Sequence, residues 1–388
     1  MKITEVKVWL VEGIKYNWTM IKIVTDTGHT GVGEATNWPG SPMIEAAAKH
    51  AGERIIGLDP LRTDFIWQKL YRDLNWVGPF GVSMCAISGI DMALLDLKGK
   101  VYGMPCYQLL GGAFRTQIRL YANYWFTGGG HTGEDYARQA KRVKEMGFTG
   151  LKFDPFAHTN YLYGEDLNTD LGLTPAQQDV AFEVTKAVRD AVGPEFDMMI
   201  ETHAMLNFEV AVKMAERLAP LGVTWYEEPA GPENADTLRA FRDRLPSGVP
   251  ICVGERHYTR HGFRLVLEKH ICDVIMPDIT RCGGPSEMKR IATMGEAYGV
   301  LVAPHNPNGP LSTLASAHVC ASIPNFFRCE FMVNDVAWRD EVLTHPLDVR
   351  DGFLHLSDRP GLGVDLIEEE LEKHPGIRGL KEKENFYV

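Results

Sequence analysis

Acidic and histidine side chains recur at the ends of short apolar runs through the middle of this chain. Residues 198–207, MMIETHAMLN, carry Glu201 and His203 two positions apart, and in an extended strand both point to the same face. Taken alone, such a run is most often the start of a solvated loop. The pattern repeats, however, in runs that end at Glu227, Glu255, Asp278, His305 and Glu330. This repetition indicates one site assembled from several elements.

Three of these carboxylates form a candidate metal site. Glu201, Glu227 and Glu255 are 26 and 28 residues apart, a spacing typical of adjacent strands in a repeated strand–helix unit. Converging carboxylates repel one another in a low-dielectric site, and all-oxygen ligation with room for water favours Mg²⁺. The alternative is that basic side chains such as Lys152 or Arg256 neutralise them. Recurrence at successive strand ends favours the metal.

Asp278 and His305 form a candidate acid–base pair. A carboxylate bonded to one ring nitrogen of a histidine fixes the tautomer and raises the basicity of the other nitrogen. A lone histidine before Asn-Pro would more often be satisfied by its own loop. Paired with Asp278 and opposite His203, His305 is predicted to be a general base.

The elements that would position these residues alternate in type. Short apolar runs between residues 118 and 330 are separated by amphipathic stretches with helical periodicity. Eight strands alternating with helices favour a parallel barrel over an open sheet, which alternation alone does not exclude. In such a barrel the active site lies at the carboxyl ends of the strands. The predicted strands are residues 118–124, 150–154, 198–202, 223–228, 250–255, 273–278, 300–305 and 326–330.

The N-terminal block follows a different pattern. Alternating runs in residues 1–35 predict an antiparallel meander, and helical periodicity follows over residues 42–100. The C-terminal part contains a short strand, a Pro-Gly-Leu-Gly turn and a polar helix, and either finishes the barrel or returns to the first block. We therefore predict an α+β block over residues 1–116, a barrel over 117–345 and a C-terminal segment over 346–388.

Composition excludes several classes of protein. With 45% hydrophobic and 23% charged residues in 388, the chain is an ordinary globular protein. A net charge of −11 argues against nonspecific nucleic-acid binding. No stretch reaches the length of a membrane span and no secretory signal is evident, so a cytoplasmic location is the default expectation. The seven cysteines are scattered without CxxC spacing, which argues against a disulfide framework or structural zinc, and we expect most of them to be buried.

The motifs around these residues resemble the enolase superfamily, specifically its mandelate racemase subgroup. The resemblance covers nearly the whole chain and is strongest to sugar-acid dehydratases of the D-galactonate dehydratase type. It rests on Lys152, ETH at 201–203, EEP at 227–229, GER at 254–256, PDITRCGG at 277–284, APHNPNGP at 303–310, PGLGV at 360–364 and DMALLDLKGKVYGMP at 91–105.

The resemblance implies a (β/α)7β TIM-like barrel under an α+β capping domain built from the N-terminal block and the C-terminal tail. It implies Mg²⁺ as cofactor, with a small-molecule acid-sugar substrate, and self-association into a homo-oligomer. The implied roles are metal ligation by Glu201, Glu227 and Glu255, base function by His305 with Asp278, acid function by His203, and contact with the substrate carboxylate by Glu330 and Lys152.

Two positions depart from the family pattern. Glu201 stands where members commonly have Asp, and Asp154 stands where racemases and cycloisomerases of the family often carry a second Lys. The missing lysine removes one candidate base and weakens the interpretation of this chain as a racemase or a cycloisomerase. Asp154, Arg256, Trp18 and Tyr161 are predicted to contact the substrate.

The predicted reaction is the dehydration of an aldonate or aldarate, with a D-galactonate-like acid as the first candidate. Removal of the α-proton and loss of the β-hydroxyl would give a 2-keto-3-deoxy acid. Three alternatives stay open: an epimerase or racemase of a hydroxy acid, a cycloisomerase of a cyclic sugar-acid derivative, and a noncatalytic metal-binding barrel. Neither nucleic acid nor membrane is expected as a partner.

Overall fold

The N-terminal block forms a three-stranded antiparallel sheet covered by helices, as its alternating pattern predicts. The computed structural model describes residues 1–13, 17–37, 40–78, 80–157, 172–245 and 248–378. Helix α3 packs so closely on β3 that a Cβ at Gly31 would lie 2.1 Å from the Ala93 carbonyl oxygen, and only glycine fits. The elements are β1 (Ile3–Val11), β2 (Trp18–Thr25), β3 (Thr30–Glu34), α1 (Ser41–Glu53), α2 (Thr63–Asp73), η1 (Asn75–Val77), α3 (Val82–Tyr102) and α4 (Cys106–Leu109).

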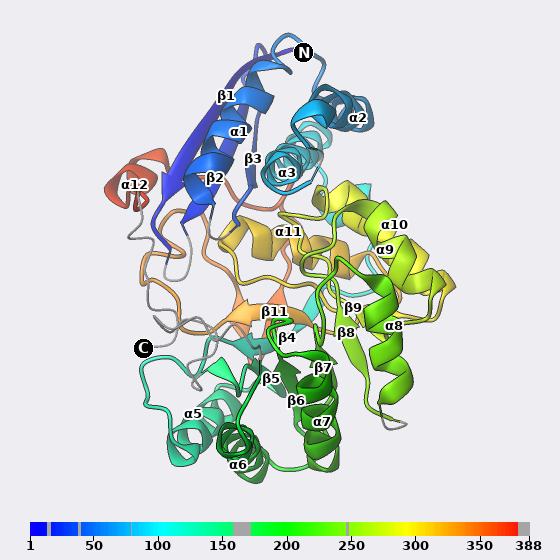
Figure 1. Ribbon diagram of the computed structural model, residues 1–388. Coiled ribbons are helices and arrows are strands. Elements are labelled where there is room, and N and C mark those ends of the chain that lie inside the picture. The colour runs from blue at the N-terminus through cyan, green and yellow to red at the C-terminus, as the bar shows by residue number, and fades with distance from the viewer. Residues whose placement is uncertain (14–16, 38–39, 79, 158–171, 246–247, 379–388) are drawn as a thin grey trace.

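Parallel strands alternating with helices form the second part, which confirms the predicted α/β repeat (Figure 1). The strand order is β10-β9-β8-β7-β6-β5-β4, and β11 pairs with the free side of β4. The elements are β4 (Gln117–Asn123), α5 (Gly133–Glu145), β5 (Gly150–Phe153), α6 (Pro175–Val192), β6 (Asp197–Glu201), α7 (Phe208–Leu218), η3 (Ala219–Leu221), β7 (Trp225–Glu227), α8 (Ala235–Arg244), β8 (Ile251–Val253), α9 (Thr259–Glu268), β9 (Val274–Ile275), α10 (Gly284–Ala297), β10 (Leu301–Val302), α11 (Pro310–Ala321) and β11 (Cys329–Met332).

Backbone contacts join the two outer strands of this sheet. Val302 of β10 makes a parallel bridge with Phe326, just before β11. The Val302 N–H donates to the Asn325 carbonyl oxygen, and the Phe327 N–H donates to the Val302 carbonyl oxygen, each over 2.9 Å. The sheet is thus linked end to end, as a (β/α)7β architecture requires. A buried apolar cluster on the strands fills its interior, made of Tyr121, Met199, Trp225, Cys252, Val274, Met276 and Ala303.

The C-terminal segment does both of the things that its sequence left open. Strands β12 (Val349–Arg350) and β13 (Phe353–His355) extend the sheet, because β13 pairs antiparallel with β4. Helix α12 (Glu368–Lys373) then lies beside β1, where the Gly376 N–H donates to the Leu10 carbonyl oxygen over 2.8 Å (Figure 1). The capping domain is therefore built from both ends of the chain. The residue boundaries 116 and 345 stay predictions.

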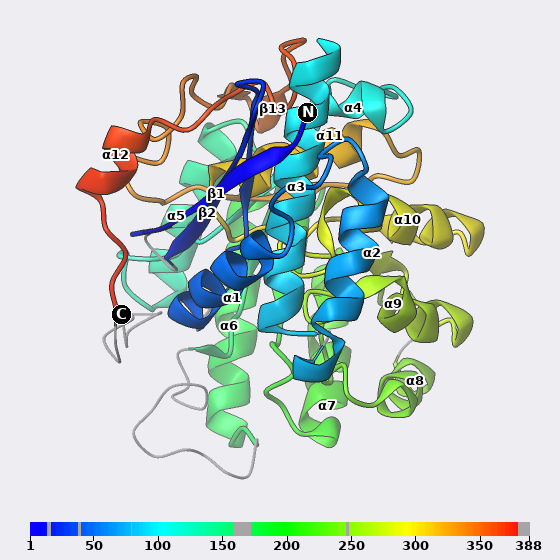
Figure 2. The same ribbon diagram turned by 90° about the horizontal axis from the view of Figure 1, so that it is seen from above.

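The capping domain lies over one end of the parallel sheet. Seen from above, helices α1, α2 and α3 cover this end (Figure 2). Helix α3 contacts α10, and β3 contacts α11, so the cap meets the helices that follow β9 and β10. All seven cysteines are buried and free, as expected. Within the described ranges, no helix combines the length and the hydropathy that a membrane span requires.

Candidate active site

The structure brings together the three carboxylates predicted to bind a metal. Parallel pairing of β6 and β7 sets Glu201 directly beside Glu227, and Glu255 follows β8. Each of the three offers a carboxylate oxygen, and these oxygens all lie within 4.8 Å of one another. All three side chains are buried. A second group of metal-ligand type among the described residues, Glu341, Glu370 and His374, is partly exposed.

Lys152 is the cation among these carboxylates. Its Nζ lies 2.6 Å from Glu227, 3.2 Å from Glu330 and 3.4 Å from Glu201, all measured to carboxylate oxygens. Burial lowers the pKa of Lys152, but the surrounding carboxylates outweigh burial and raise it well above its usual value. The ammonium group is therefore charged at neutral pH.

A single lysine does not neutralise the charge of all the carboxylates around it. Burial and the charge of Glu201 raise the pKa of Glu227 well above its usual range, and the side chains of these two residues are hydrogen-bonded to each other. The crowding of carboxylates therefore favours the protonated form of Glu227. Three buried oxygen donors that repel one another when ionised fit a hard divalent cation, which would relieve this repulsion.

His305 and Asp278 form the predicted pair. His305 Nδ1 lies 2.7 Å from Asp278 Oδ2, and Nε2 lies 2.9 Å from Glu255 Oε2. Burial lowers the pKa of His305, but Glu255, Glu330 and Asp278 outweigh burial and raise it to about 9. The Thr280 N–H donates to Asp278 Oδ1 over 2.8 Å and helps to fix the carboxylate. One ring nitrogen is thus oriented by Asp278, and the other faces the carboxylate triad.

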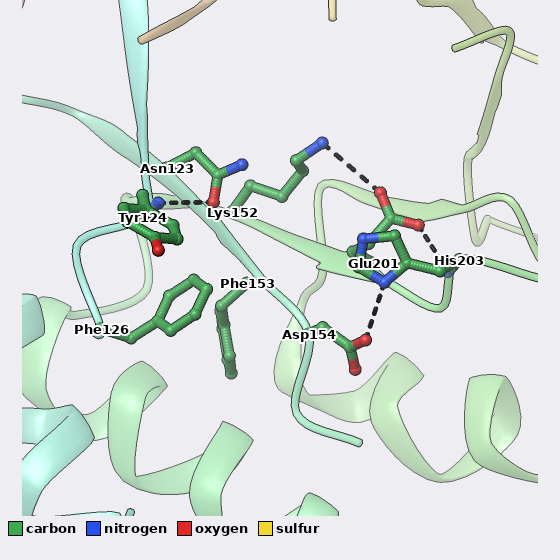
Figure 3. A pocket seen from close by; sticks show the side chains of 8 residues that line it. All are labelled: Asn123, Tyr124, Phe126, Lys152, Phe153, Asp154, Glu201 and His203. Atoms are coloured by element: carbon green, nitrogen blue, oxygen red, sulfur yellow. Dashed lines mark hydrogen bonds and ion pairs between the residues drawn. The ribbon is translucent and has the colours of Figure 1, made fainter. Parts of the chain in front are cut away.

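A second histidine–aspartate pair lies on the other side of the triad in strand order. His203 Nδ1 is 2.8 Å from Asp154 Oδ2 (Figure 3). Asp154 Oδ1 accepts from the Phe156 N–H over 2.8 Å, so both carboxylate oxygens are used within the protein. Burial lowers the pKa of His203, but Glu201 and Asp154 outweigh it and raise the pKa. Asp154 is placed against His203, a pairing that the sequence did not indicate, and substrate contact by Asp154 stays a prediction.

Backbone strain is concentrated at these strand ends. His203, Ala204 and Glu228 have φ of 48°, 53° and 42°, which non-glycine residues rarely adopt. Such conformations cost roughly 1–3 kcal/mol each and persist only where neighbours enforce them. Here the Ala204 N–H donates to the Glu228 carbonyl oxygen over 2.8 Å, and the Thr202 hydroxyl donates to the same oxygen over 2.7 Å. The strain turns His203 out of the strand.

A hollow of about 270 Å³ opens beside His203 (Figure 3). This volume includes the open solvent above the lining side chains. Asn123, the last residue of β4, and Tyr124 and Phe126 just after it line this hollow. They were missed from the sequence although β4 itself was predicted. The Asn123 amide donates to Glu330 Oε1 over 2.5 Å. The other lining residues are Lys152, Phe153, Asp154, Glu201 and His203.

The remaining predicted substrate contacts have different surroundings. Trp18 is 2% exposed and packs in the large apolar cluster that also contains barrel residues. Arg256 Nε donates to Glu228 over 2.6 Å, so its guanidinium already has a buried ionic partner. Tyr161 lies outside the described residues. Substrate contact by Trp18, Arg256 and Tyr161 stays a prediction.

Characterised proteins resemble this chain over nearly its whole length. It is 32% identical to D-xylonate dehydratase from Haloferax volcanii over 383 residues, covering 96% of this chain and 89% of that protein. It is 33% identical to D-galactonate dehydratase from Variovorax paradoxus, covering 96% and 94%. A crystal structure of an enolase superfamily member from Salmonella Typhimurium matches with a TM-score of 0.89 and 33% identity, covering 96% of this chain and 98% of that one.

Two family models divide the chain between them. The N-terminal domain of mandelate racemase and muconate lactonizing enzyme matches residues 13–111. The enolase C-terminal domain-like family matches residues 135–370, which is more than half of the chain and contains both histidine–aspartate pairs and the carboxylate triad. The chain therefore belongs to the enolase superfamily, in the family of mandelate racemase and muconate lactonizing enzyme.

Proposed function

We propose that this protein is a Mg²⁺-dependent dehydratase that converts a sugar acid, an aldonate or aldarate, into a 2-keto-3-deoxy acid. The observation that carries the proposal is the arrangement of two histidine–aspartate pairs on either side of a buried carboxylate triad. Dehydration of a hydroxy acid needs one group to remove a proton and another to protonate the departing hydroxyl. The names of the relatives from Haloferax and Variovorax support a sugar-acid substrate.

His305 is the base of the proposed reaction, because Mg²⁺ bound to Glu255 would offset the carboxylate charge that raises the pKa of this ring in the metal-free protein. Asp278 holds Nδ1, so Nε2 is the atom that takes the proton from the carbon next to the substrate carboxylate. The electron pair of the broken C–H bond moves toward the carboxylate and gives an ene-diolate. Asp278 stabilises the imidazolium that forms.

His203 is the acid. Glu201 and Asp154 raise the pKa of its ring, which favours the protonated form. The ring donates this proton to the β-hydroxyl as the C–O bond breaks, and water leaves. The resulting enol takes up a proton at the β-carbon and releases the proton of its hydroxyl, which gives the 2-keto acid with no net change in protons. Loss of a proton from His305 to solvent and uptake of one by His203 restore both rings, so atoms and charge balance over the cycle.

Mg²⁺ would be held by Glu201, Glu227 and Glu255, and when bound it supplies positive charge that acidifies the α-proton and stabilises the ene-diolate. Lys152 adds a fixed positive charge beside the triad. Glu330 is held by Lys152, by the Asn306 N–H over 2.7 Å and by Asn123 over 2.5 Å, and orients this charge. A D-galactonate-like acid is the first substrate to test.

The test is to incubate the purified protein and Mg²⁺ with a stereochemically complete set of aldonic and aldaric acids in deuterated water. Keto-acid formation from at least one acid is expected. His305→Asn should lower keto-acid formation and α-proton exchange together by roughly 10²- to 10⁴-fold, the range expected for loss of a general base. His270→Asn, at an exposed position, is the matched control and should retain the rate.

Three results would contradict the proposal. Deuterium uptake without loss of water would indicate an epimerase or racemase. A product of unchanged mass formed by expulsion of a ring oxygen would indicate a cycloisomerase. Binding of Mg²⁺ without turnover of any acid would indicate a noncatalytic barrel.

A further inference from the structure

The capping domain reaches the segment that carries His305 through a single buried carboxylate. Glu34, the last residue of β3, has 0% exposure. Its Oε1 accepts from the Gly309 N–H over 2.7 Å, and its Oε2 accepts from the Ser312 N–H over 2.9 Å. Ser312 lies in the first turn of α11, and Gly309 is the residue just before this helix. A Cβ at Gly309 would lie 2.8 Å from this carboxylate, so the approach requires glycine.

The first turn of α11 in turn holds the residue that follows His305. The Ser312 hydroxyl donates to Asn306 Oδ1 over 2.7 Å, and the Asn306 side-chain amide donates to the Thr313 hydroxyl over 2.9 Å. The Asn306 N–H donates to Glu330 Oε2 over 2.7 Å. The backbone next to His305 is therefore fixed by hydrogen bonds that begin at the helix anchored by Glu34.

The same cap segment also connects to Asp278, the partner of His305, through Thr280. The Thr280 hydroxyl lies 2.6 Å from the Thr36 carbonyl oxygen and 2.7 Å from Asp278 Oδ1. The Asn308 amide lies 3.1 Å from Asp278 Oδ2. Residues 34–36 of the cap thus connect to both the loop after β9 and the loop after β10. All of these side chains are buried, so water does not substitute for the missing partner if one bond is lost.

We propose that Glu34 is a positioning residue, which fixes His305 against Asp278 by anchoring the first turn of α11 from the capping domain. The capping domain then takes part in setting the geometry of the base in addition to covering the site. The role of His305 as base rests on the proposed function above. The connection from Glu34 to the His305–Asp278 pair does not rest on the proposed function, because it consists of hydrogen bonds seen in the structure.

Glu34→Gln is the direct test, because it keeps the size of the side chain but replaces one acceptor oxygen with an NH₂ group that faces a backbone N–H. We expect kcat and α-proton exchange to fall roughly 10- to 100-fold with KM nearly unchanged, since misplacing a reacting group by about 1 Å can cost about 100-fold. We also expect the low-field proton resonance of His305 Nδ1–H to shift or broaden. Its assignment comes from its absence in His305→Asn.

Asp96→Asn is the matched control. Asp96 is also a buried cap carboxylate that accepts from two backbone N–H groups, those of Val32 over 2.8 Å and Leu362 over 2.7 Å, but it contacts neither catalytic loop. It should lower stability without changing the resonance or the kcat of the folded enzyme. If Asp96→Asn lowers kcat as much as Glu34→Gln, general loosening of the cap explains both and the proposal is wrong.

A milder variant covers the case in which Glu34→Gln does not fold. Ser312→Ala removes only the hydroxyl that bonds Asn306, and a shift of the His305 resonance with a smaller fall in kcat is expected. An unchanged resonance and an unchanged kcat in the folded variants would overturn the proposal. If the wild-type protein turns over no sugar acid, the proposed function fails, but the resonance still tests the inference because it needs no substrate.

Discussion

Glu201 shows at the scale of one residue how one carboxylate serves both the triad and the turn that follows its strand. Its Oε1 accepts from the N–H groups of Thr202 over 3.0 Å and His203 over 2.7 Å, while Oε2 faces Lys152 over 3.4 Å. One oxygen therefore fixes the strained turn that presents His203, and the other remains directed at the triad. A glutamate can do both because its extra methylene lets the carboxylate fold back over the following backbone.

Asp154 carries the prediction at this scale, because among the described residues its ionic partner is His203. Asp154→Asn removes the charge that favours the imidazolium, so protonation of the departing hydroxyl should slow by roughly 10- to 100-fold, a part of the 10²–10⁴ attributed to general acids. Exchange of the α-proton should continue, because His305 is untouched. Both are measured on one sample in deuterated water by mass spectrometry.

Asp278→Asn is the comparison variant for this experiment, since it should slow both exchange and elimination. Equal loss of exchange and elimination in Asp154→Asn would contradict the assignment of His203 as acid. It would instead give His203 a role in the first proton transfer.

At the scale of elements, the apolar runs predicted every parallel strand, but not where each strand ends. Asp278 and His305 lie three residues beyond β9 and β10. The chain leaves the ladder early because side chains take over as partners of the backbone, as when the Thr280 N–H donates to Asp278. Spacing therefore predicts which residues converge, since the carboxyl ends of parallel strands meet at one edge.

Side-chain pairing could not be predicted in the same way. The contact of His203 with Asp154 depends on a positive φ at His203. A glycine at this position would indicate a positive φ in the sequence, whereas a histidine does not. Asn123 and Tyr124 were missed because neither is a charged residue, so only their position at the end of β4 could have indicated them. In the sequence, Glu34 is separated from Gly309 by 275 positions and from Ser312 by 278 positions. No local pattern reveals hydrogen bonds between residues so far apart.

The contact between α3 and α10 leads to a prediction about how the stability of the fold depends on pH. Asp91 of α3 is buried, and its Oδ2 accepts from the Ser286 N–H over 2.9 Å at the start of α10. Burial raises the pKa of Asp91 to about 7. The folded state therefore binds this proton more tightly than the unfolded chain, so its contribution to stability is full below about pH 4. It is lost as the pH rises through about 7.

Asp91→Asn cannot ionise, and the uncharged amide keeps an oxygen for the Ser286 N–H. Relative to the wild type, the variant should become more stable between pH 4 and pH 8 by on the order of 1–4 kcal/mol. Thermal melting of both proteins at several pH values measures this change. A difference in melting temperature that stays constant over the range would show that Asp91 is ionised in the folded state throughout.

At the scale of the whole molecule, the two ends of the chain are joined within the cap. The Glu12 N–H donates to the His374 carbonyl oxygen over 2.9 Å, and Lys22 pairs with Glu368 over 3.0 Å. The cap that they form lies over one end of the parallel sheet (Figure 2). A ligand bound at the carboxylate triad stabilises the entire folded chain, because the unfolded chain lacks the site.

Addition of Mg²⁺ should raise the melting temperature. A ligand at 100 times its Kd stabilises the folded state by about 2.7 kcal/mol, and release of repulsion among the three carboxylates is the physical source. Scanning calorimetry with and without a chelator measures the shift. In Glu227→Gln the shift should be much smaller, and an equal shift in this variant would place the ion elsewhere.

The seven buried thiols can be used to measure how readily each region of the fold opens. They are distributed over the cap helices α3 and α4, over β8, β11 and α11, and over the loops after α9 and β9. Burial raises the pKa of Cys85 and Cys272 to about 12, so these thiols are protonated as well as shielded in the folded chain. Alkylating reagents need an exposed thiolate. Each cysteine therefore serves as a built-in reporter of the opening of its own region, and mass spectrometry of the alkylated peptides would order the cap and the barrel by how readily each opens.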